Sequence, residues 1–347
     1  SGYDVTIFAS SVMHNMNIDL IEDNAPFVER QYDDLHFVHI KTKKYSHNDI
    51  NRFIGLVEFP IKFLHIAKNF DEPDVIVQTA TVPFGNIIAK YAQKVQARYI
   101  VEVLDLWPET FVELGFIGKK NPALPFLYYT EKKAYQRADV IVFSMEGGKN
   151  YIIDKKWNME QGGPLDLQKV HYINNGVDLT DFDRYKADYQ IEDAVLTDDA
   201  LKKVIYVGSM RLANNLRKLI DAAALLQEYK DIKFLLYGDG DDRKVLENYC
   251  KENNISNVIF KEKWIDPKYV PYVLSQATLN VLNYMPGHFA EYGGSQSKMF
   301  QYMASGKPIC CNLKMMYCPI NKNNIGIARV YNDAQDYANA ILSIIQM

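Results

Sequence analysis

Short apolar segments alternate with longer amphipathic segments along almost the whole chain. The short segments have the length of buried strands, and the longer ones repeat their apolar positions with the period of a helix. This alternation is typical of parallel sheets covered by helices. It predicts strands over 4–9, 35–40, 75–78, 99–104, 140–144 and 170–173 in the first half, and over 203–207, 233–237, 258–261, 279–282, 309–311 and 326–330 in the second.

Two groups of six strands predict two domains. With 347 residues, of which 48% are hydrophobic, the chain is long enough to bury two cores. An acidic, weakly apolar segment from about 183 to 199 separates the halves, so we expect domains over 1–185 and 186–347. Residues 1–3 lead directly into what looks like a second strand, so we expect the first strand–turn–helix unit of the N-terminal domain to be missing.

Charge and composition exclude several partners. A formal net charge of -4 gives no global basic field, so a nucleic acid is not the expected partner. The four cysteines lack metal-ligand spacing and suit buried thiols of a cytoplasmic protein; no metal is expected. No run of about 18 apolar residues predicts a membrane span. Residues 59–68 suit either a core helix or peripheral contact at the inner face of the cell membrane.

A glycine-rich turn before a helix stands out at 291–308. Gly293, Gly294 and Ser295 precede the helix, which Ser297 and Lys298 open. The unpaired N–H groups and the positive dipole end of such a helix favour a bound phosphate, and Lys298 adds a full charge. The alternative is an ordinary helix cap with a surface lysine.

Two further strand-end turns in the same half suggest a diphosphate and its nucleoside. The run YVGSMRLANNL at 206–216 brings a glycine turn and basic side chains, and YGDGDD at 237–242 has glycines that let a base or ribose approach the backbone. A ligand-free turn is the alternative for the second run. The donor-binding candidates are Gly208, Ser209, Arg211, Asn215, Lys218, Gly238, Asp239, Gly240, Trp264, Glu291, Gly293, Gly294, Ser295, Ser297 and Gln301.

The run DLWPE at 105–109 follows an apolar strand of the first half. Ligands of open parallel sheets bind beyond the carboxyl ends of strands, so Asp105, Trp107 and Glu109 are expected on that face. Trp107 could stack on a sugar on the acceptor side, and the carboxylates could orient a hydroxyl group or accept its proton. Asp105 could equally cap a helix that has Pro108 near its first position.

Six motifs, taken in chain order, resemble the retaining glycosyltransferases of family 4. They are DLWPE at 105–109, FSM at 143–145, NNGVD at 174–178, YVGSM with NNL at 206–216, YGDGD at 237–241 and SKMFQYMASGKPI at 297–309. The first and the last look most like bacterial enzymes that build capsule, O-antigen or exopolysaccharide units. The resemblance implies an α/β GT-B fold, in which two Rossmann-like doubly wound domains face a cleft. It also implies a UDP- or GDP-sugar donor, retention at the anomeric carbon, no cofactor, and a saccharide or lipid-linked saccharide acceptor.

The chain lacks four charged residues of the family pattern. The two basic residues that hold the donor diphosphate in the family fall on Ser209 and Asn214, and its two glutamates fall on Gly293 and Gln301. We expect Arg211, Lys218 and Lys298 to supply the missing charge, and Gln301 to bond ribose hydroxyls.

The preferred function is therefore a metal-independent glycosyltransferase with Asp105, Glu109 and Lys298 as catalytic candidates. A nucleotide-sugar 2-epimerase, which would turn over the donor alone, is the nearest alternative enzyme. A catalytically silent sugar-nucleotide-binding subunit is the alternative from another class, since a fold alone does not fix activity.

Overall fold

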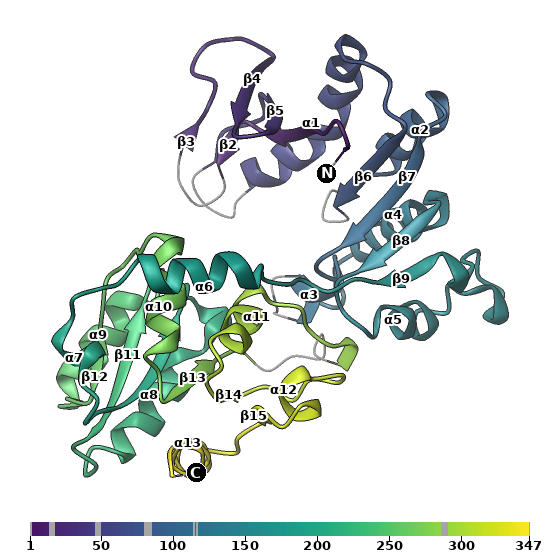
Figure 1. The fold of residues 1–347 in the computed structure, drawn as a ribbon. Helices are drawn as coiled ribbons and strands as arrows, with labels where there is room; N and C mark the ends of the chain where they lie inside the picture. The colour runs from purple at the N-terminus through teal and green to yellow at the C-terminus, as the bar shows by residue number, and fades with distance from the viewer. Residues whose placement is uncertain are drawn as a thin grey trace. The chain divides into compact units, whose positions relative to one another are not determined.

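The computed structural model describes residues 2–13, 18–45, 50–79, 85–113, 115, 117–285 and 291–346. Contacts divide the chain into two compact units (Figure 1). The first unit comprises Ser1–Phe143 and Ile152–Tyr172, and the second comprises Ser144–Tyr151 and Ile173–Met347. The predicted boundary between residues 185 and 186, and the assignment of acceptor and donor sides to the two domains, stay predictions.

The second unit is built on one parallel sheet of six strands in the order β12-β11-β10-β13-β14-β15. The strands are β10 (Lys202–Val207), β11 (Ile232–Tyr237), β12 (Val258–Phe260), β13 (Leu279–Leu282), β14 (Ile309–Cys311) and β15 (Gly326–Ala328). The chain starts at β10, adds two strands on one side, and then crosses to the other side with β13. The carboxyl ends of β10 and β13 thus form a topological switch point, where open parallel sheets bind ligands.

Alternate residues of these strands enter two different cores, as the two-residue period of a strand requires. Val204 and Phe234 lie in a core with α8 (Leu216–Leu225) and α13 (Ala334–Ile345), and Ile205 and Leu235 lie in a core with α10 (Val270–Ser275). Burial on both faces explains why the strands read as continuous apolar runs. The remaining helices of this unit are α6 (Leu179–Asp188), α7 (Ala194–Thr197), η4 (Leu212–Asn214), α9 (Arg243–Glu252), η5 (Pro267–Tyr269), α11 (Ser297–Ala304) and α12 (Pro319–Lys322).

The first unit has two larger sheets. One is β1-β5-β4, in which β1 (Thr6–Ser10) runs parallel to β5 (Leu35–Ile40) and β4 (Phe27–Tyr32) runs antiparallel to it. The other is the parallel sheet of β6 (Val75–Thr79), β7 (Arg98–Val103), β8 (Val140–Phe143) and β9 (Val170–Tyr172). A two-stranded ribbon joins β2 (Val12–Met13) to β3 (Ile18–Asp19).

Helices cover these sheets. Helix α1 (Ile50–Ile66) packs on β1 and β5, where the ring of Phe63 meets Phe8 edge-on with centroids 5.0 Å apart. Helix α2 (Asn86–Lys94) packs on β6, β7 and α4 (Leu124–Arg137). The other helices are η1 (Ala67–Asn69), α3 (Glu109–Glu113), η2 (Met159–Gln161) and η3 (Leu167–Lys169), with α5 (Gly148–Asp154) running across the division between the units.

All twelve predicted strands are present, each within two residues of its predicted bounds. The sequence pattern did not predict β2, β3 or β4. Strand β4 is half-exposed and carries Glu29, Arg30 and Gln31, so it lacks the apolar run of a buried strand. Segment 59–68 forms the end of α1 and the start of η1, with Phe63, Ile66 and Ala67 buried, as a core helix requires. Within the described residues, no helix is both long and apolar enough to cross a membrane.

Candidate functional site

Two strand-end loops of the second unit lie against each other at the switch point. Gly208 follows β10 and donates its N–H to the carbonyl oxygen of Tyr237 at 3.0 Å, and Met210 donates to the carbonyl oxygen of Asp239 at 2.8 Å. The sequence predicted both loops at the same edge, and the structure brings them into direct backbone contact.

The glycines of these loops are required by the contact itself. A Cβ atom on Gly238 would fall 1.9 Å from the Gly208 carbonyl oxygen, and one on Gly240 would fall 2.2 Å from that of Met210. Both glycines also have positive φ angles, 125° and 156°. Loop packing therefore explains these residues on its own, and the predicted approach of a base or ribose stays a prediction.

Lys298, on the first turn of α11, reaches back to the loop after β10. Its ammonium group lies 3.1 Å from the hydroxyl oxygen of Tyr206 and 4.9 Å from the centre of that ring. A Cβ atom on Gly208, where φ is 152°, would fall 2.1 Å from Lys298 Nζ. The Lys298 ammonium group thus lies against the Gly208 turn, although the two residues are 90 positions apart in the sequence.

The charge on Lys298 is not balanced by a carboxylate in the described part of the chain. Salt bridges there involve other lysines and arginines, and burial alone lowers the pKa of Lys298 to about 8. A cation removed from water without a counter-ion is unfavourable unless an anion joins it. The position at the switch point and the missing partner both indicate an anion-binding site.

Arg211 adds a second cation on the same loop. Its Nε atom is covered by protein and has no hydrogen-bond partner among the described residues. Beside it, the Ser209 hydroxyl donates to Oδ1 of the buried Asn214 at 3.0 Å, so Asn214 holds the loop where the family pattern has a basic residue.

Lys218 does not join this group. Its ammonium group donates to the carbonyl oxygen of Tyr331 at 2.5 Å, which ties α8 to the segment after β15. Asn215, in the left-handed region with φ 44°, starts α8, and its carbonyl oxygen accepts a bond from Nδ2 of Asn283 at 2.7 Å. Both residues thus have structural partners in the second unit.

The turn before α11 is fixed by a residue that we had not proposed for the site. The backbone N–H of Asn175 donates to the Ser295 hydroxyl at 2.7 Å, and its side chain donates to the Ser295 carbonyl oxygen. Gly293 in this turn has φ 92°, while Gly294 lies against Gln296, whose buried Oε1 atom has no hydrogen-bond partner in the described part of the chain. The NNGVD motif at 174–178 was the available signal for Asn175.

The remaining donor candidates lie on more open positions. Trp264 is 72% exposed, and Asp239 lies 3.9 Å from the Lys263 ammonium group, with both side chains largely in water. Glu291 and Ser297 are exposed, and Gln301 is half-buried on α11.

In the first unit, the DLWPE run is partly structural. The indole of Trp107 meets Phe111 edge-on with ring centroids 4.7 Å apart and packs on a cluster of Val112, Leu124 and Leu127. Its Nε1 atom is buried and finds no hydrogen-bond partner within the described ranges. This packing shows how the ring is held; its predicted stacking on a sugar stays a prediction.

The two carboxylates of the run differ in their surroundings. Glu109 accepts a hydrogen bond from the Tyr128 hydroxyl group at 2.7 Å and forms an ion pair with Lys155. The Lys155 ammonium group also lies 4.2 Å from the centre of the Tyr128 ring. Asp105 has no such side-chain partner in the described chain, and nearby protein atoms raise the pKa of its carboxyl group by limiting hydration. Of the two carboxylates, that of Asp105 is therefore the one still available to accept a hydrogen bond from a substrate.

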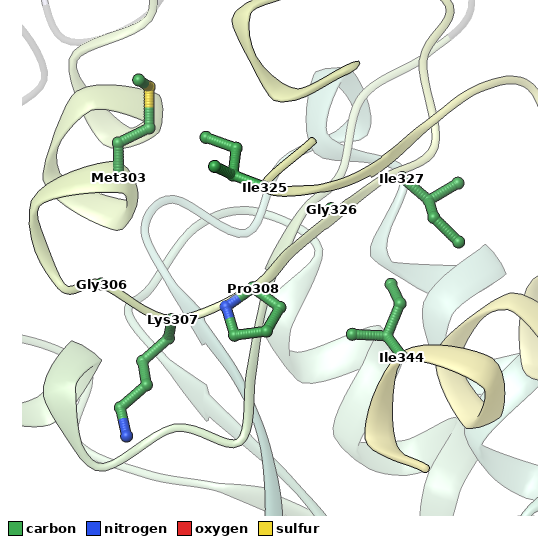
Figure 2. A pocket seen from close by; sticks show the side chains of 8 residues that line it. All are labelled: Met303, Gly306, Lys307, Pro308, Ile325, Gly326, Ile327 and Ile344. Atoms are coloured by element: carbon green, nitrogen blue, oxygen red, sulfur yellow. The ribbon is translucent and has the colours of Figure 1, made fainter. Parts of the chain in front are cut away.

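A pocket of about 300 Å³ opens at the opposite edge of the second unit's sheet (Figure 2). Pro308 precedes β14 and Gly326 begins β15, so the pocket lies at the amino ends of the strands, away from the Gly208 turn. Its other lining residues are Met303, Gly306, Lys307, Ile325, Ile327 and Ile344. The described residues hold no cluster of three or more acidic, histidine or cysteine side chains that could bind a metal ion.

Residues 190–347 match the family model described as Glycosyl transferases group 1. One curated relative, a 2-deoxystreptamine N-acetyl-D-glucosaminyltransferase from Niallia circulans, is 27% identical over 135 residues. The aligned part is 39% of this chain and 31% of the relative, so less than a third of that protein is matched.

Several solved structures are similar over most of the chain. An E. coli trehalose-6-phosphate protein bound with UDP-2-fluoro glucose has a TM-score of 0.71 at 12% identity, covering 99% of this chain and 85% of that one. An α,α-trehalose-phosphate synthase (UDP-forming) from Burkholderia xenovorans has a TM-score of 0.72 at 13% identity, covering 99% and 92%. Anabaena HepE in complex with UDP and glucose has a TM-score of 0.56 at 15% identity, covering 83% and 72%. These likenesses confirm the predicted α/β fold of the GT-B type.

Proposed function

We propose that this chain, whose residues 190–347 match the model of the Glycosyl transferases group 1 family, transfers a sugar from a nucleoside-diphosphate sugar to a saccharide acceptor. The observation that carries the proposal is the Lys298 ammonium group, which is held over the Gly208 turn at the switch point and has no carboxylate beside it among the described residues. A diphosphate supplies the missing negative charge, and the Arg211 side chain on the same loop supplies a second cation for it.

The proposed reaction uses this charge at the step where the donor is cleaved. The bond between the anomeric carbon and the diphosphate oxygen breaks, and a bond to the acceptor oxygen forms on the same face of the sugar. The acceptor proton leaves with the nucleoside diphosphate or passes to Asp105. Lys298 and the N–H groups at the start of α11 stabilise the charge that grows on the leaving diphosphate.

UDP is the favoured nucleoside diphosphate. Two of the structurally similar proteins were solved with UDP or a UDP-sugar, and the curated relative is an N-acetyl-D-glucosaminyltransferase. The DLWPE and SKMFQYMASGKPI motifs support a role in bacterial surface polysaccharide synthesis, with a lipid-linked saccharide as acceptor. Glucose and N-acetylglucosamine are accordingly the first donor sugars to test.

A thermal-shift panel of UDP, GDP and CDP tests the donor site. At about 100 times its dissociation constant, the true ligand adds about 2.7 kcal/mol of stability. Replacing Lys298 by alanine should remove most of that gain. An equal gain in the variant and the wild type would overturn the assignment.

Turnover distinguishes a transferase from the two alternatives. A transferase releases free UDP when the saccharide acceptor is added. An epimerase converts the donor sugar without an acceptor, and a silent binding subunit shows neither product despite binding UDP. Either of these results would replace the proposed activity.

A further inference from the structure

We propose that Tyr206 is a positioning residue that holds the Lys298 ammonium group over the Gly208 turn and so sets the affinity of the donor site. The inference rests on the donor site proposed above. It starts from the hydroxyl group of Tyr206, which contacts both the loop after β10 and the side chain from α11.

The Tyr206 hydroxyl group makes two interactions, one as a hydrogen-bond donor and one as an acceptor. It donates its hydrogen to the carbonyl oxygen of Ser209 at 2.6 Å, so only a lone pair remains to face Lys298 Nζ at 3.1 Å. Burial raises the pKa of this phenol well above 10, so it stays neutral and keeps its hydrogen. Tyr206 therefore offers an oriented acceptor to a cation that has no carboxylate partner in the described chain.

The aromatic ring of Tyr206 is held in place by the residues packed around it. Tyr206 belongs to strand β10, is 1% exposed and lies in the main core of the second unit, which also contains Leu219 of helix α8. Its hydroxyl group also fixes the carbonyl oxygen of Ser209, one residue beyond Gly208. A single side chain thus links the turn to the ammonium group, and both belong to the surface that the diphosphate is proposed to contact.

Tyr302 provides a matched control. It is another buried tyrosine, and its hydroxyl group accepts from the backbone N–H of Val207 at 2.9 Å and lies 3.2 Å from the carbonyl oxygen of the same residue. Tyr302→Phe loosens the end of β10 next to the turn without removing a partner of Lys298. Tyr206→Phe removes that partner, while both variants keep the ring in the core.

The direct test is the protonation of Lys298 in the full chain without ligand. Acetylation rates at Lys298, followed by mass spectrometry from about pH 6.5 to about pH 10, report the fraction of neutral amine. In Tyr206→Phe the midpoint should fall by about half a pH unit or more, because the charged form loses its acceptor. In Tyr302→Phe it should match the wild type.

The second readout is UDP affinity at neutral pH. Losing a hydrogen bond to a charged group should weaken UDP binding about tenfold in Tyr206→Phe. Thermal unfolding of both variants checks that each one is folded. The inference is overturned if the Lys298 midpoint stays at the wild-type value in Tyr206→Phe, or if Tyr302→Phe moves it equally. If the wild type binds none of UDP, GDP and CDP, that result counts against the proposed donor site. The role of Tyr206 is then still tested by comparing the Lys298 titration midpoint between Tyr206→Phe and the wild type.

Discussion

Lys298 Nζ lies where a side chain on residue 208 would have to be: a Cβ atom added to Gly208 would be 2.1 Å from it. The two residues come from the end of β10 and the start of α11, and they meet because the parallel sheet brings both to one edge. The Lys298 ammonium group can therefore occupy this position only because residue 208 is glycine.

Gly208→Ala should displace the ammonium group and weaken UDP binding by about tenfold or more, since a charged contact is lost. Isothermal titration calorimetry with UDP measures the change. Gly306→Ala is the control, because Gly306 also has a positive φ of 67° but has no atom within 4 Å of an added Cβ. The control should lose stability and keep its UDP affinity; equal affinity losses in both variants would speak against the contact.

Lys298→Met should make the unliganded protein more stable while removing the stabilisation by UDP. The wild-type side chain places a charge in a water-poor site where no described residue provides a counter-ion, and methionine fills similar space without that cost. For a unit of this size, each kcal/mol gained raises Tm by about 2–4 °C. Lys307→Met, at the pocket on the opposite edge of the sheet, should retain the UDP response. A lower Tm for unliganded Lys298→Met would contradict the account.

UDP binding should depend on pH around the pKa of Lys298. With a pKa of about 8, the ammonium group is charged below pH 8 and loses its proton above it, so affinity should be level below pH 8 and fall above it. A bound diphosphate favours the charged form and raises this pKa, so binding at pH 8 should take up on the order of half a proton. Calorimetry in two buffers of different ionisation enthalpy measures the uptake. Lys298→Met should show none of it.

The sequence was sufficient for the twelve predicted strands, and it named Gly208 and Lys298 as separate candidates for one donor site. Strands buried on both faces show as apolar runs, and glycine turns at their carboxyl ends mark the edge where Gly208 and Lys298 meet. The half-exposed β4 lacks such a run and was missed. Residue 238 has to be glycine because a Cβ atom there would collide with the Gly208 carbonyl oxygen, and Asn175 holds Ser295 by a hydrogen bond. Both contacts join segments that are distant in the sequence, so no local sequence pattern predicts them.

Arg211 and Lys218 were equivalent candidates in the sequence, and their contacts now separate them. Arg211→Ala should weaken UDP binding, because Arg211 Nε has no hydrogen-bond partner in the part of the chain that the structure describes. Lys218→Ala should leave UDP affinity unchanged and lower the free energy of unfolding by about 1 kcal/mol, because its bond to the Tyr331 carbonyl oxygen is lost. Calorimetry and urea unfolding of both variants measure the two quantities. The reverse pattern would place Lys218 in the donor site.

The two carboxylates of DLWPE should separate in the same manner in the first unit. Glu109→Gln breaks the ion pair with Lys155 and weakens the bond from Tyr128, so it should mainly lower Tm. Asp105→Asn removes a carboxylate with no such partner in the described chain, so it should lower kcat for transfer and change Tm little.

The pH profile identifies which carboxylate limits turnover. The raised pKa of Asp105 means that its carboxylate is protonated at a higher pH than an ordinary aspartate. If Asp105 orients the acceptor or accepts its proton, the acidic limb of kcat should lie above the ordinary aspartate range and should disappear in Asp105→Asn. An unchanged acidic limb in that variant, together with its loss in Glu109→Gln, would transfer the role to Glu109 despite its two structural partners.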